Sequence, residues 1–317
     1  MKRTIKDYVL ITLKGTGMGA ADVIPGVSGG TIAFITGIYE ELLSSIKNLP
    51  FAVKTLISNK FNLRLFWKEV NGNFLLALLL GIFTSILSLA KLMTYLLVNY
   101  PVPVWSFFFG LILASVWFVL KDIDKWKIPY CISFILGIAA GYLITVISPS
   151  ETTNALWFIF LSGVIAICAM ILPGISGSFI LLLMGKYAYI LDALVNFNIL
   201  VIVVFAVGAV IGIISFSHFL SWLLKKYNFP TIAFLAGIMF GSLNKIWPWK
   251  QTVEWAVNSN GEQISVVEKN IFPATYSELT GAPSLVVYAI VMMLIGFSII
   301  FIIDTVSAKF KQNEVKQ

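Results

Sequence analysis

The chain has 317 residues, of which 59% are hydrophobic and 12% are charged, and its mean hydropathy is +0.92. A soluble domain carries about 25% charged residues, so the composition excludes a soluble domain and indicates a polytopic membrane protein. The net charge of +7 fits positive charge on cytoplasmic loops, and we expect no nucleic-acid partner. Cys131 and Cys168 lie in apolar stretches and exclude a disulfide scaffold. With one histidine in the chain, we expect neither a metal nor a cofactor.

The first half begins with a short basic segment followed by two apolar arms. Neither arm has the roughly 20 apolar residues that a spanning helix needs. We therefore interpret residues 8–46 as a re-entrant hairpin that enters and leaves on one side, and residues 47–73 as a basic insert along the interface. Three spans are predicted next, at residues 74–98, 104–120 and 129–147. Together these segments form a first domain, residues 1–150.

The second half, residues 151–317, has the same order of segments without the basic insert. A broken hairpin is predicted at residues 155–195. The spans that follow are predicted at 199–224, 231–247 and 284–303, with a polar loop at about 248–282 between the last two and a cytoplasmic tail after them. The fold class that we predict is therefore an all-α polytopic membrane protein built from two repeats.

The repeat is carried by a helix-breaking stretch that occurs twice, as Pro25-Gly26-Val27-Ser28-Gly29-Gly30-Thr31 and as Pro173-Gly174-Ile175-Ser176-Gly177-Ser178. Proline removes a backbone donor and glycine tolerates bends, so each stretch predicts a break in a helix. The offset between the copies is 148, and it also aligns Gly37 with Gly185 and Tyr39 with Tyr187. Further matches between the spans have an offset of 127, and the difference of 21 is the basic insert. Because each repeat has an odd number of spans, three, the second repeat enters the membrane from the side opposite to the first. This predicts inverted-topology repeats.

A paired break at membrane depth indicates the binding site of a transporter. Serine after a bend caps the next helix, and the open N-terminus of a helix favours an anion. We predict that the set binds a phosphate through backbone N–H and hydroxyl groups; its members are Ser28, Gly29, Gly30, Thr31, Ser176, Gly177 and Ser178. The alternative for the same small residues is close packing of helices, and both roles are compatible.

Four ionisable residues lie in or beside apolar segments. Asp22, three residues before Pro25, is a candidate for a coupling proton or for organising Lys14, and the alternative is a carboxylate bonded to backbone at a helix end. Lys91 and His218 are repeat mates that are candidates for receiving a headgroup. The alternatives are a lysine that reaches the interface and a hydrogen-bonded helix residue. We interpret Lys186 as a solvated lysine at the interface, and the alternative is a lysine that attracts headgroups at the outer mouth.

Orientation follows from the positive charges. With both termini in the cytoplasm and each broken pair returning to its own side, 17 of the 22 Lys and Arg residues fall on cytoplasmic segments. The exceptions are Lys91, Lys186, Lys245, Lys250 and Lys269. We therefore expect a multi-pass protein of the plasma (inner) membrane with cytoplasmic N- and C-termini.

With both breaks in view, the chain resembles the DUF368 family of polyprenyl-phosphate transporters. The resemblance rests on two segments, Gly19-Ala20-Ala21-Asp22-Val23-Ile24-Pro25-Gly26-Val27-Ser28-Gly29-Gly30-Thr31 and Ile171-Leu172-Pro173-Gly174-Ile175-Ser176-Gly177-Ser178, and it covers roughly residues 8–305. It implies a transporter, not an enzyme, that returns undecaprenyl phosphate or a similar polyprenyl phosphate to the cytoplasmic leaflet for cell-envelope synthesis. The resemblance leaves the coupling ion, H⁺ or Na⁺, and the oligomeric state open.

Two other functions compete with a lipid-phosphate flippase. A permease for a small soluble anion would use the same helix ends but would need a cavity closed to lipid. A membrane phosphatase acting on polyprenyl diphosphate would need a nucleophile or base with several arginines or a metal. The chain has only two arginines, Arg3 and Arg64, and both lie outside the predicted spans, which disfavours the phosphatase.

Overall fold

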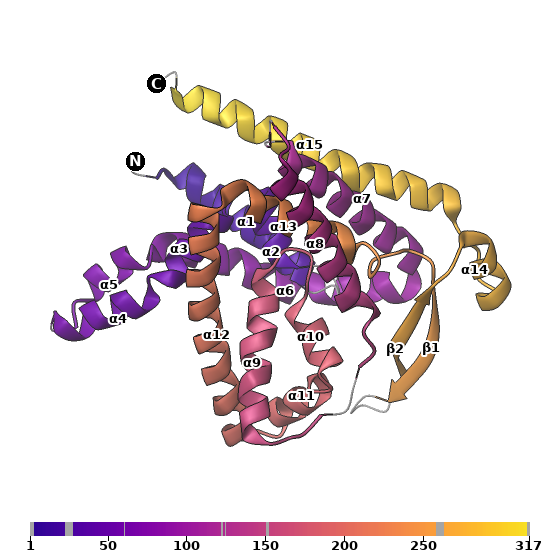
Figure 1. The fold of residues 1–317 in the computed structure, drawn as a ribbon, viewed down its shortest axis with the longest axis horizontal. Coiled ribbons are helices and arrows are strands. Elements are labelled where there is room, and N and C mark those ends of the chain that lie inside the picture. Colours follow the sequence, from indigo (N-terminus) through magenta and orange to yellow (C-terminus); the bar gives the residue numbers. More distant parts are fainter. Residues whose placement is uncertain are drawn as a thin grey trace. The chain divides into compact units, whose positions relative to one another are not determined.

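The computed structural model describes residues 3–22, 28–59, 61–121, 123, 125–149, 152–257 and 263–315, and these residues are mostly helical (Figure 1). Their contacts divide the chain into two compact units. Unit 1 comprises Met1–Met93 and Ser148–Thr231, and unit 2 comprises Thr94–Ile147 and Ile232–Gln317. Each unit therefore combines a segment of the first half of the chain with a segment of the second half.

Unit 1 contains the helices on either side of both breaks. They are α1 (Ile5–Asp22), α2 (Gly29–Ile35), α3 (Tyr39–Lys47), α4 (Leu49–Ser58), α5 (Leu63–Glu69), most of α6 (Gly72–Asn99), α9 (Leu156–Ile171), α10 (Gly177–Leu183), α11 (Tyr187–Val195) and α12 (Ile199–Lys226). Unit 2 contains α7 (Pro101–Leu120), α8 (Ile128–Val146), most of α13 (Asn228–Ser242), β1 (Lys250–Val257), β2 (Gln263–Asn270), α14 (Pro273–Thr280) and α15 (Val286–Val315).

The helix boundaries follow the two offsets of the sequence repeat. Helices α2 and α3 reappear 148 residues later as α10 and α11, with the same lengths. Helix α6 reappears 127 residues later as α12, again with the same length. The repeat is therefore present in the secondary structure as well as in the sequence, whereas the inverted orientation of the second copy stays a prediction.

The arm that follows each break is bent a second time. Gly37 ends α2 with a φ of 71° and Gly185 ends α10 with a φ of 63°, a left-handed conformation that glycine adopts without steric cost. The bend between α10 and α11 is 108°. Each predicted hairpin is therefore built from three helices instead of two straight arms.

Glycines set the closest helix crossings, and these crossings also repeat. In unit 1, α1 crosses α6 at Gly15 and Gly81, and α9 crosses α12 at their repeat mates Gly163 and Gly208. A Cβ atom at any of the four would lie 2.0–2.3 Å from a carbonyl oxygen of the facing helix, so a larger residue would separate the helices. Close approach through small residues is the usual way for membrane helices to pack.

The matching crossings in unit 2 join helices from different halves of the chain. Helix α7 crosses α15 at Gly110 and Gly296, and α13 crosses α8 at Gly237 and Gly137. Here too a Cβ atom would lie 2.0–2.3 Å from a carbonyl oxygen of the facing helix. Each half of the chain therefore contributes one helix to each crossing, so in unit 2 the helices of one repeat pack against helices of the other.

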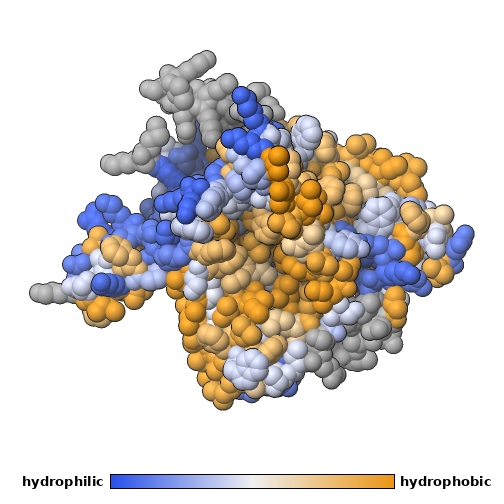
Figure 2. All heavy atoms as spheres, viewed as in Figure 1, coloured by the Kyte–Doolittle hydropathy of each residue, from blue (hydrophilic) through white to orange (hydrophobic). Residues whose placement is uncertain are grey.

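Among the described residues, four helices are long and apolar enough to cross a membrane, or five if the bent pair α10–α11 is one span. The four are α6, α7, α8 and α12, and three further apolar helices are shorter, at Leu156–Ile171, Asn228–Ser242 and Val286–Ile302. Figure 2 shows apolar residues over α9 and α12, and both hydrophilic and apolar residues near α4 and α5 in the basic insert. This distribution suits a multi-pass protein with an amphipathic insert.

The segment expected to be a polar loop, about residues 248–282, contains regular structure. Strands β1 and β2 form an antiparallel hairpin, and α14 follows them. Trp249 and Trp247 anchor the segment, because their indole N–H groups donate to the carbonyls of Ser284 and Ile271 at 2.7 and 2.9 Å. The hairpin is small, and the fold is all-α apart from it.

Candidate functional site

The two breaks meet within unit 1. The hydroxyl of Ser28 donates to the carbonyl of Met170 at 3.2 Å, and the backbone N–H of Gly174 donates to the hydroxyl oxygen of Thr31 at 2.8 Å. The buried Tyr39 hydroxyl donates to the carbonyl of Ile171 at 3.0 Å. These bonds satisfy carbonyls and an N–H that the break at residues 172–176 leaves without helical partners, so residues next to the first break complete the second.

The N-terminus of α2, the helix after the first break, is occupied by the protein's own groups. The N–H of Gly29 donates to a carboxylate oxygen of Asp22 at 2.7 Å, and the N–H of Gly30 donates to the hydroxyl of its N-cap Ser28 at 3.1 Å. The N–H of Thr31 donates to the carbonyl of Ser28 at 2.9 Å. Asp22, mostly buried at the end of α1, is thus an internal anion at the position where an external anion was predicted.

The N-terminus of α10, the helix after the second break, is open. Its N-cap Ser176 makes no side-chain bond to the backbone of the helix, and its hydroxyl pairs with that of Ser178 at 2.8 Å. In the described part of the chain, no acceptor bonds to the backbone N–H of Gly177 or Ser178. Two backbone donors and two hydroxyls therefore lie within three consecutive residues at this end of α10.

Glycines at the breaks are required by close contacts. A Cβ atom at Gly29 would lie 2.5 Å from the Asp22 carboxylate, and one at Gly30 would lie 2.7 Å from the carbonyl oxygen of Ile171. A Cβ atom at Gly177 would lie 2.7 Å from the carbonyl oxygen of Ala166 in α9. Close packing, the alternative role for these small residues, therefore operates here together with any role in binding.

The other residues predicted to break the helices are Pro173 and Gly174 in the second break and Pro25 and Gly26 in the first. Gly174 has a φ of 88°, a conformation that only glycine adopts readily, and follows Pro173 at the turn between α9 and α10. Pro25 and Gly26 lie outside the described residues.

Lys91 and His218 take no part in the contacts between the breaks. Both are exposed, Lys91 on α6 and His218 on α12. The Nδ1 atom of His218 lies 2.9 Å from the carbonyl of Ile214, one turn earlier, which is the local hydrogen bond considered as its alternative role. Their prediction as headgroup residues stays untested.

The interpretation of Lys186 as a solvated lysine is wrong, because its side chain is only 2% exposed. Its ammonium group donates to the carbonyl of Thr152 at 2.8 Å and to the side-chain oxygen of Asn154 at 2.7 Å. It also lies 5.7 Å from the ring centroids of Phe158 and Tyr189. Hydropathy treats lysine as a surface residue and gives no sign of acceptors that come from another segment.

Tyr39 was aligned with Tyr187 in the repeat but was given no role. Its ring packs edge-on against Phe34, with centroids 5.1 Å apart, while its hydroxyl holds the last turn of α9. In the sequence, only its identity with Tyr187 in the repeat set Tyr39 apart. Tyr187 itself is 37% exposed, whereas Tyr39 is buried. A repeat mate therefore does not reveal which copy carries the contact.

A second polar cluster lies in unit 2, beside the β hairpin. The ammonium groups of Lys245 and Lys250 are each 3.3 Å from the same carboxylate oxygen of Glu268, and Lys250 also lies 3.9 Å from the ring centroid of Trp105. Burial lowers the pKa of Lys250 to about 8, although Glu268 opposes the shift. Burial raises the pKa of Glu268, but the two lysines outweigh it and hold that pKa below its usual value. Within the described residues, no group of three metal-ligating side chains is present here or elsewhere.

Comparison with known proteins identifies the family. Residues 18–264 match the model of a family described as undecaprenyl phosphate translocase-like. A polyprenyl-phosphate transporter of Vibrio cholerae serotype O1 is 49% identical over 304 residues, which cover 96% of this chain and 98% of that protein. A polyprenyl-phosphate transporter of Staphylococcus aureus is 33% identical over 267 residues, covering 78% of this chain and 89% of that protein. No solved structure was found to match. The chain belongs to the undecaprenyl phosphate translocase-like family.

Proposed function

We propose that this chain is a transporter that moves polyprenyl phosphate across the membrane while the prenyl chain stays in the lipid. The observation that carries this proposal is the similarity to the Vibrio cholerae polyprenyl-phosphate transporter, which extends over nearly the whole of both chains. The site supplies a physical basis for it. Two helix breaks join there, and among the described residues no acceptor bonds to the backbone N–H groups of Gly177 and Ser178 at the N-terminus of α10.

The proposed phosphate site is centred on Ser176, Gly177 and Ser178. Two backbone N–H groups and two hydroxyls can replace part of the hydration shell of a phosphate, and they require no counterion from the protein. In this proposal the hydroxyls exchange their mutual hydrogen bond for bonds to phosphate oxygens. The binding energy therefore comes from charge-assisted bonds, which are stronger than the neutral bond that they replace.

The first break provides the second part of the proposed site, and Asp22 controls access to it. A phosphate can reach the N–H groups of Gly29 and Gly30 only after the Asp22 carboxylate leaves Gly29 and the Ser28 hydroxyl releases Gly30. The N–H of Thr31 must in addition leave the carbonyl of Ser28. Protonation of Asp22 weakens its bond to Gly29 and removes a like charge next to the phosphate. We therefore assign the coupling ion as a proton, carried by Asp22.

The proposed direction of transport is toward the cytoplasmic leaflet of the plasma membrane, and both termini are placed in the cytoplasm. This orientation is supported by the 17 of 22 Lys and Arg residues that it places on the cytoplasmic side. The proposed product is a carrier lipid returned to the side on which cell-envelope precursors are made.

The test uses purified protein in liposomes with a labelled polyprenyl phosphate, and measures movement of the label between leaflets. We expect the protein to accelerate that movement, with no acceleration for labelled phosphatidylglycerol and no uptake of inorganic phosphate. Uptake of inorganic phosphate without lipid movement would instead support the small-anion permease. Release of phosphate from polyprenyl diphosphate would support the phosphatase.

A further inference from the structure

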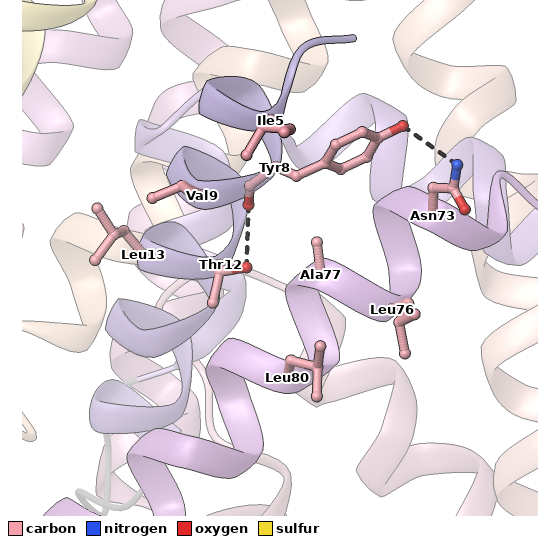
Figure 3. Close-up of a pocket in the computed structure, with 9 residues that line it drawn as sticks. All are labelled: Ile5, Tyr8, Val9, Thr12, Leu13, Asn73, Leu76, Ala77 and Leu80. Carbon is pink, nitrogen blue, oxygen red and sulfur yellow. Dashed lines mark hydrogen bonds between the residues drawn. The ribbon is translucent and has the colours of Figure 1, made fainter.

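An open groove of about 440 Å³ lies between α1 and α6 within unit 1 (Figure 3). The side chain of Tyr8 extends across from α1 toward Asn73 on α6, and the Asn73 amide donates to the Tyr8 hydroxyl at 3.4 Å. One turn further along each helix, Thr12 and Ala77 face the space between the helices, and Leu80 lies beyond them. The groove thus has a polar end at Tyr8 and Asn73, and from Asn73 to Leu80 it follows α6 for about 10 Å, the rise of seven helical residues.

The polar end of the groove lies in the most basic part of the chain. Residues 1–71 contain nine basic and five acidic side chains, a net charge of +4 out of +7 for the whole chain. Arg3 lies 5.5 Å from the ring centroid of Phe74, next to Asn73, and it also pairs with Glu41. Lys6 is exposed on α1, and Asp7 is engaged with Thr4 at the start of that helix. The excess of basic side chains in residues 1–71 therefore favours an anionic headgroup at this end, although Arg3 itself is paired with Glu41.

The polar groups at this end keep donors available. Trp67 donates to the side-chain oxygen of Asn73 at 2.7 Å, which fixes the orientation of the amide. The Tyr8 hydroxyl accepts its bond from Asn73, so its own proton can be donated to an oxygen of a ligand. A phosphate at this position would accept a hydrogen bond from a neutral donor, the Tyr8 hydroxyl.

The second repeat does not reproduce the groove residues, although it reproduces the helix crossing. Under the two offsets, Thr12 and Ala77 correspond to Phe160 and Val204, and Tyr8 corresponds to Leu156. The crossing of α9 and α12 at Gly163 and Gly208 has the same close contacts as that of α1 and α6. Larger apolar residues are therefore compatible with this crossing, and small residues at 12 and 77 are a feature of the first copy alone.

We propose that the groove binds the prenyl chain of the substrate, with its phosphate at the Tyr8–Asn73 end. This inference rests on the proposed function and adds a binding site to it, distinct from the helix breaks. The basic end complements a phosphate, and the apolar length accommodates the first isoprene units, so the lipid is held where it leaves the protein on the side of the N-terminus. If the lipid leaves the protein on one side of the membrane only, a groove is expected in one repeat and not in the other.

The experiment is photo-crosslinking in liposomes with a polyprenyl phosphate that carries a diazirine on one of its first isoprene units. Labelled peptides are identified by mass spectrometry, and phosphatidylglycerol with a diazirine in its acyl chain is the comparison lipid. We expect the prenyl probe to label residues 5–13 and 72–80 in preference to the comparison lipid. Equal labelling of these residues by both probes, or labelling by the prenyl probe elsewhere only, would overturn the inference.

Two variants taken from the protein's own second repeat fill the groove, Thr12→Phe and Ala77→Val. Each should lower labelling of the groove by about tenfold, the effect of overfilling a packed site by roughly 1.4 kcal/mol. Leu87→Phe, at a position on α6 that is 82% exposed, should label like wild type. Undiminished labelling in both filled variants would exclude the groove as the binding position.

Tyr8→Phe keeps the shape of the groove and removes one hydroxyl. We expect it to weaken binding of polyprenyl phosphate by about two- to tenfold, the net effect of one hydrogen bond. Unchanged affinity would exclude a headgroup at Tyr8. Transport by the wild-type protein is measured in the same liposomes: transport without labelling of the groove overturns this inference alone, whereas absence of transport counts against the proposed function itself.

Discussion

Replacing Asp22 by Asn tests the proposal that an internal carboxylate competes with the substrate. Asparagine keeps the shape of the side chain and an oxygen that can accept from Gly29, but it has no charge. A hydrogen bond to a charged group contributes about 1.5–3 kcal/mol and a neutral one about 0.5–1.5 kcal/mol. Displacing the neutral side chain from the N-terminus of α2 should therefore cost about 1 kcal/mol less, before the loss of repulsion from the phosphate is included.

The expected result is binding of polyprenyl phosphate at least about fivefold tighter in Asp22→Asn than in wild type, from about 1 kcal/mol at 25 °C. Affinity is measured by titration in nanodiscs between pH 5.5 and 8. The lipid phosphate itself titrates near pH 6, which changes the affinity of both proteins. The affinity of wild type at each pH is therefore divided by that of the variant at the same pH. The ratio of the two affinities should approach one only at a pH low enough to protonate Asp22.

The matched control is Asp192→Asn. Asp192 lies exposed on α11, and its carboxylate accepts from Asn196 one turn later, so it has no contact with either break. This variant should bind and respond to pH like wild type. Equal affinity of Asp22→Asn and wild type across the whole pH range would refute the reasoning, because the carboxylate would then not compete with the phosphate.

Four further outcomes follow from the contacts. Ser178→Ala should weaken binding of polyprenyl phosphate by roughly tenfold or more through loss of a charge-assisted bond, measured by the same titration. Thr31→Val should instead lower the melting temperature, because the Gly174 N–H loses its acceptor at a cost of about 1–3 kcal/mol. Lys186→Met should destabilise the protein by a similar amount, about 1–3 kcal/mol in thermal unfolding, since it leaves the Thr152 carbonyl unpaired. For Lys250, the pKa of about 8 lies below that of the unfolded chain, so wild-type stability should rise between pH 8 and 10.5 as the buried charge is lost, and Lys250→Met should abolish that rise in melting temperature.

The repeat could be predicted from the sequence in considerable detail, because helix breakers are rare in apolar segments and their spacing is informative. Gly37 and Gly185 were aligned by the offset of 148, and both end a helix with a left-handed φ. The β hairpin could not be predicted in the same way. Its strands lie in a short polar segment, where hydropathy separates loops from spans and gives little sign of strand pairing.

The site was predicted in part. The residues at both breaks were identified, but the bonds between them join positions more than 130 residues apart, such as Tyr39 and Ile171, and no local pattern encodes such contacts. The alignment of Asp22 with Met170 showed that the two breaks differ. It did not indicate that the Asp22 carboxylate accepts from the N-terminus of α2. Burial of Lys186 depends on acceptors from the segment before α9, which explains why it was mistaken for a surface residue.

The most direct test of the central claim is an experimental structure of the protein with polyprenyl phosphate bound in a lipid nanodisc at low pH. We expect a phosphate within hydrogen-bonding distance of the Gly177 and Ser178 N–H groups, with the bond between the Ser176 and Ser178 hydroxyls broken and Asp22 moved away from Gly29. A headgroup bound elsewhere, with the Ser176–Ser178 pair and the Asp22–Gly29 bond both intact, would contradict this expectation.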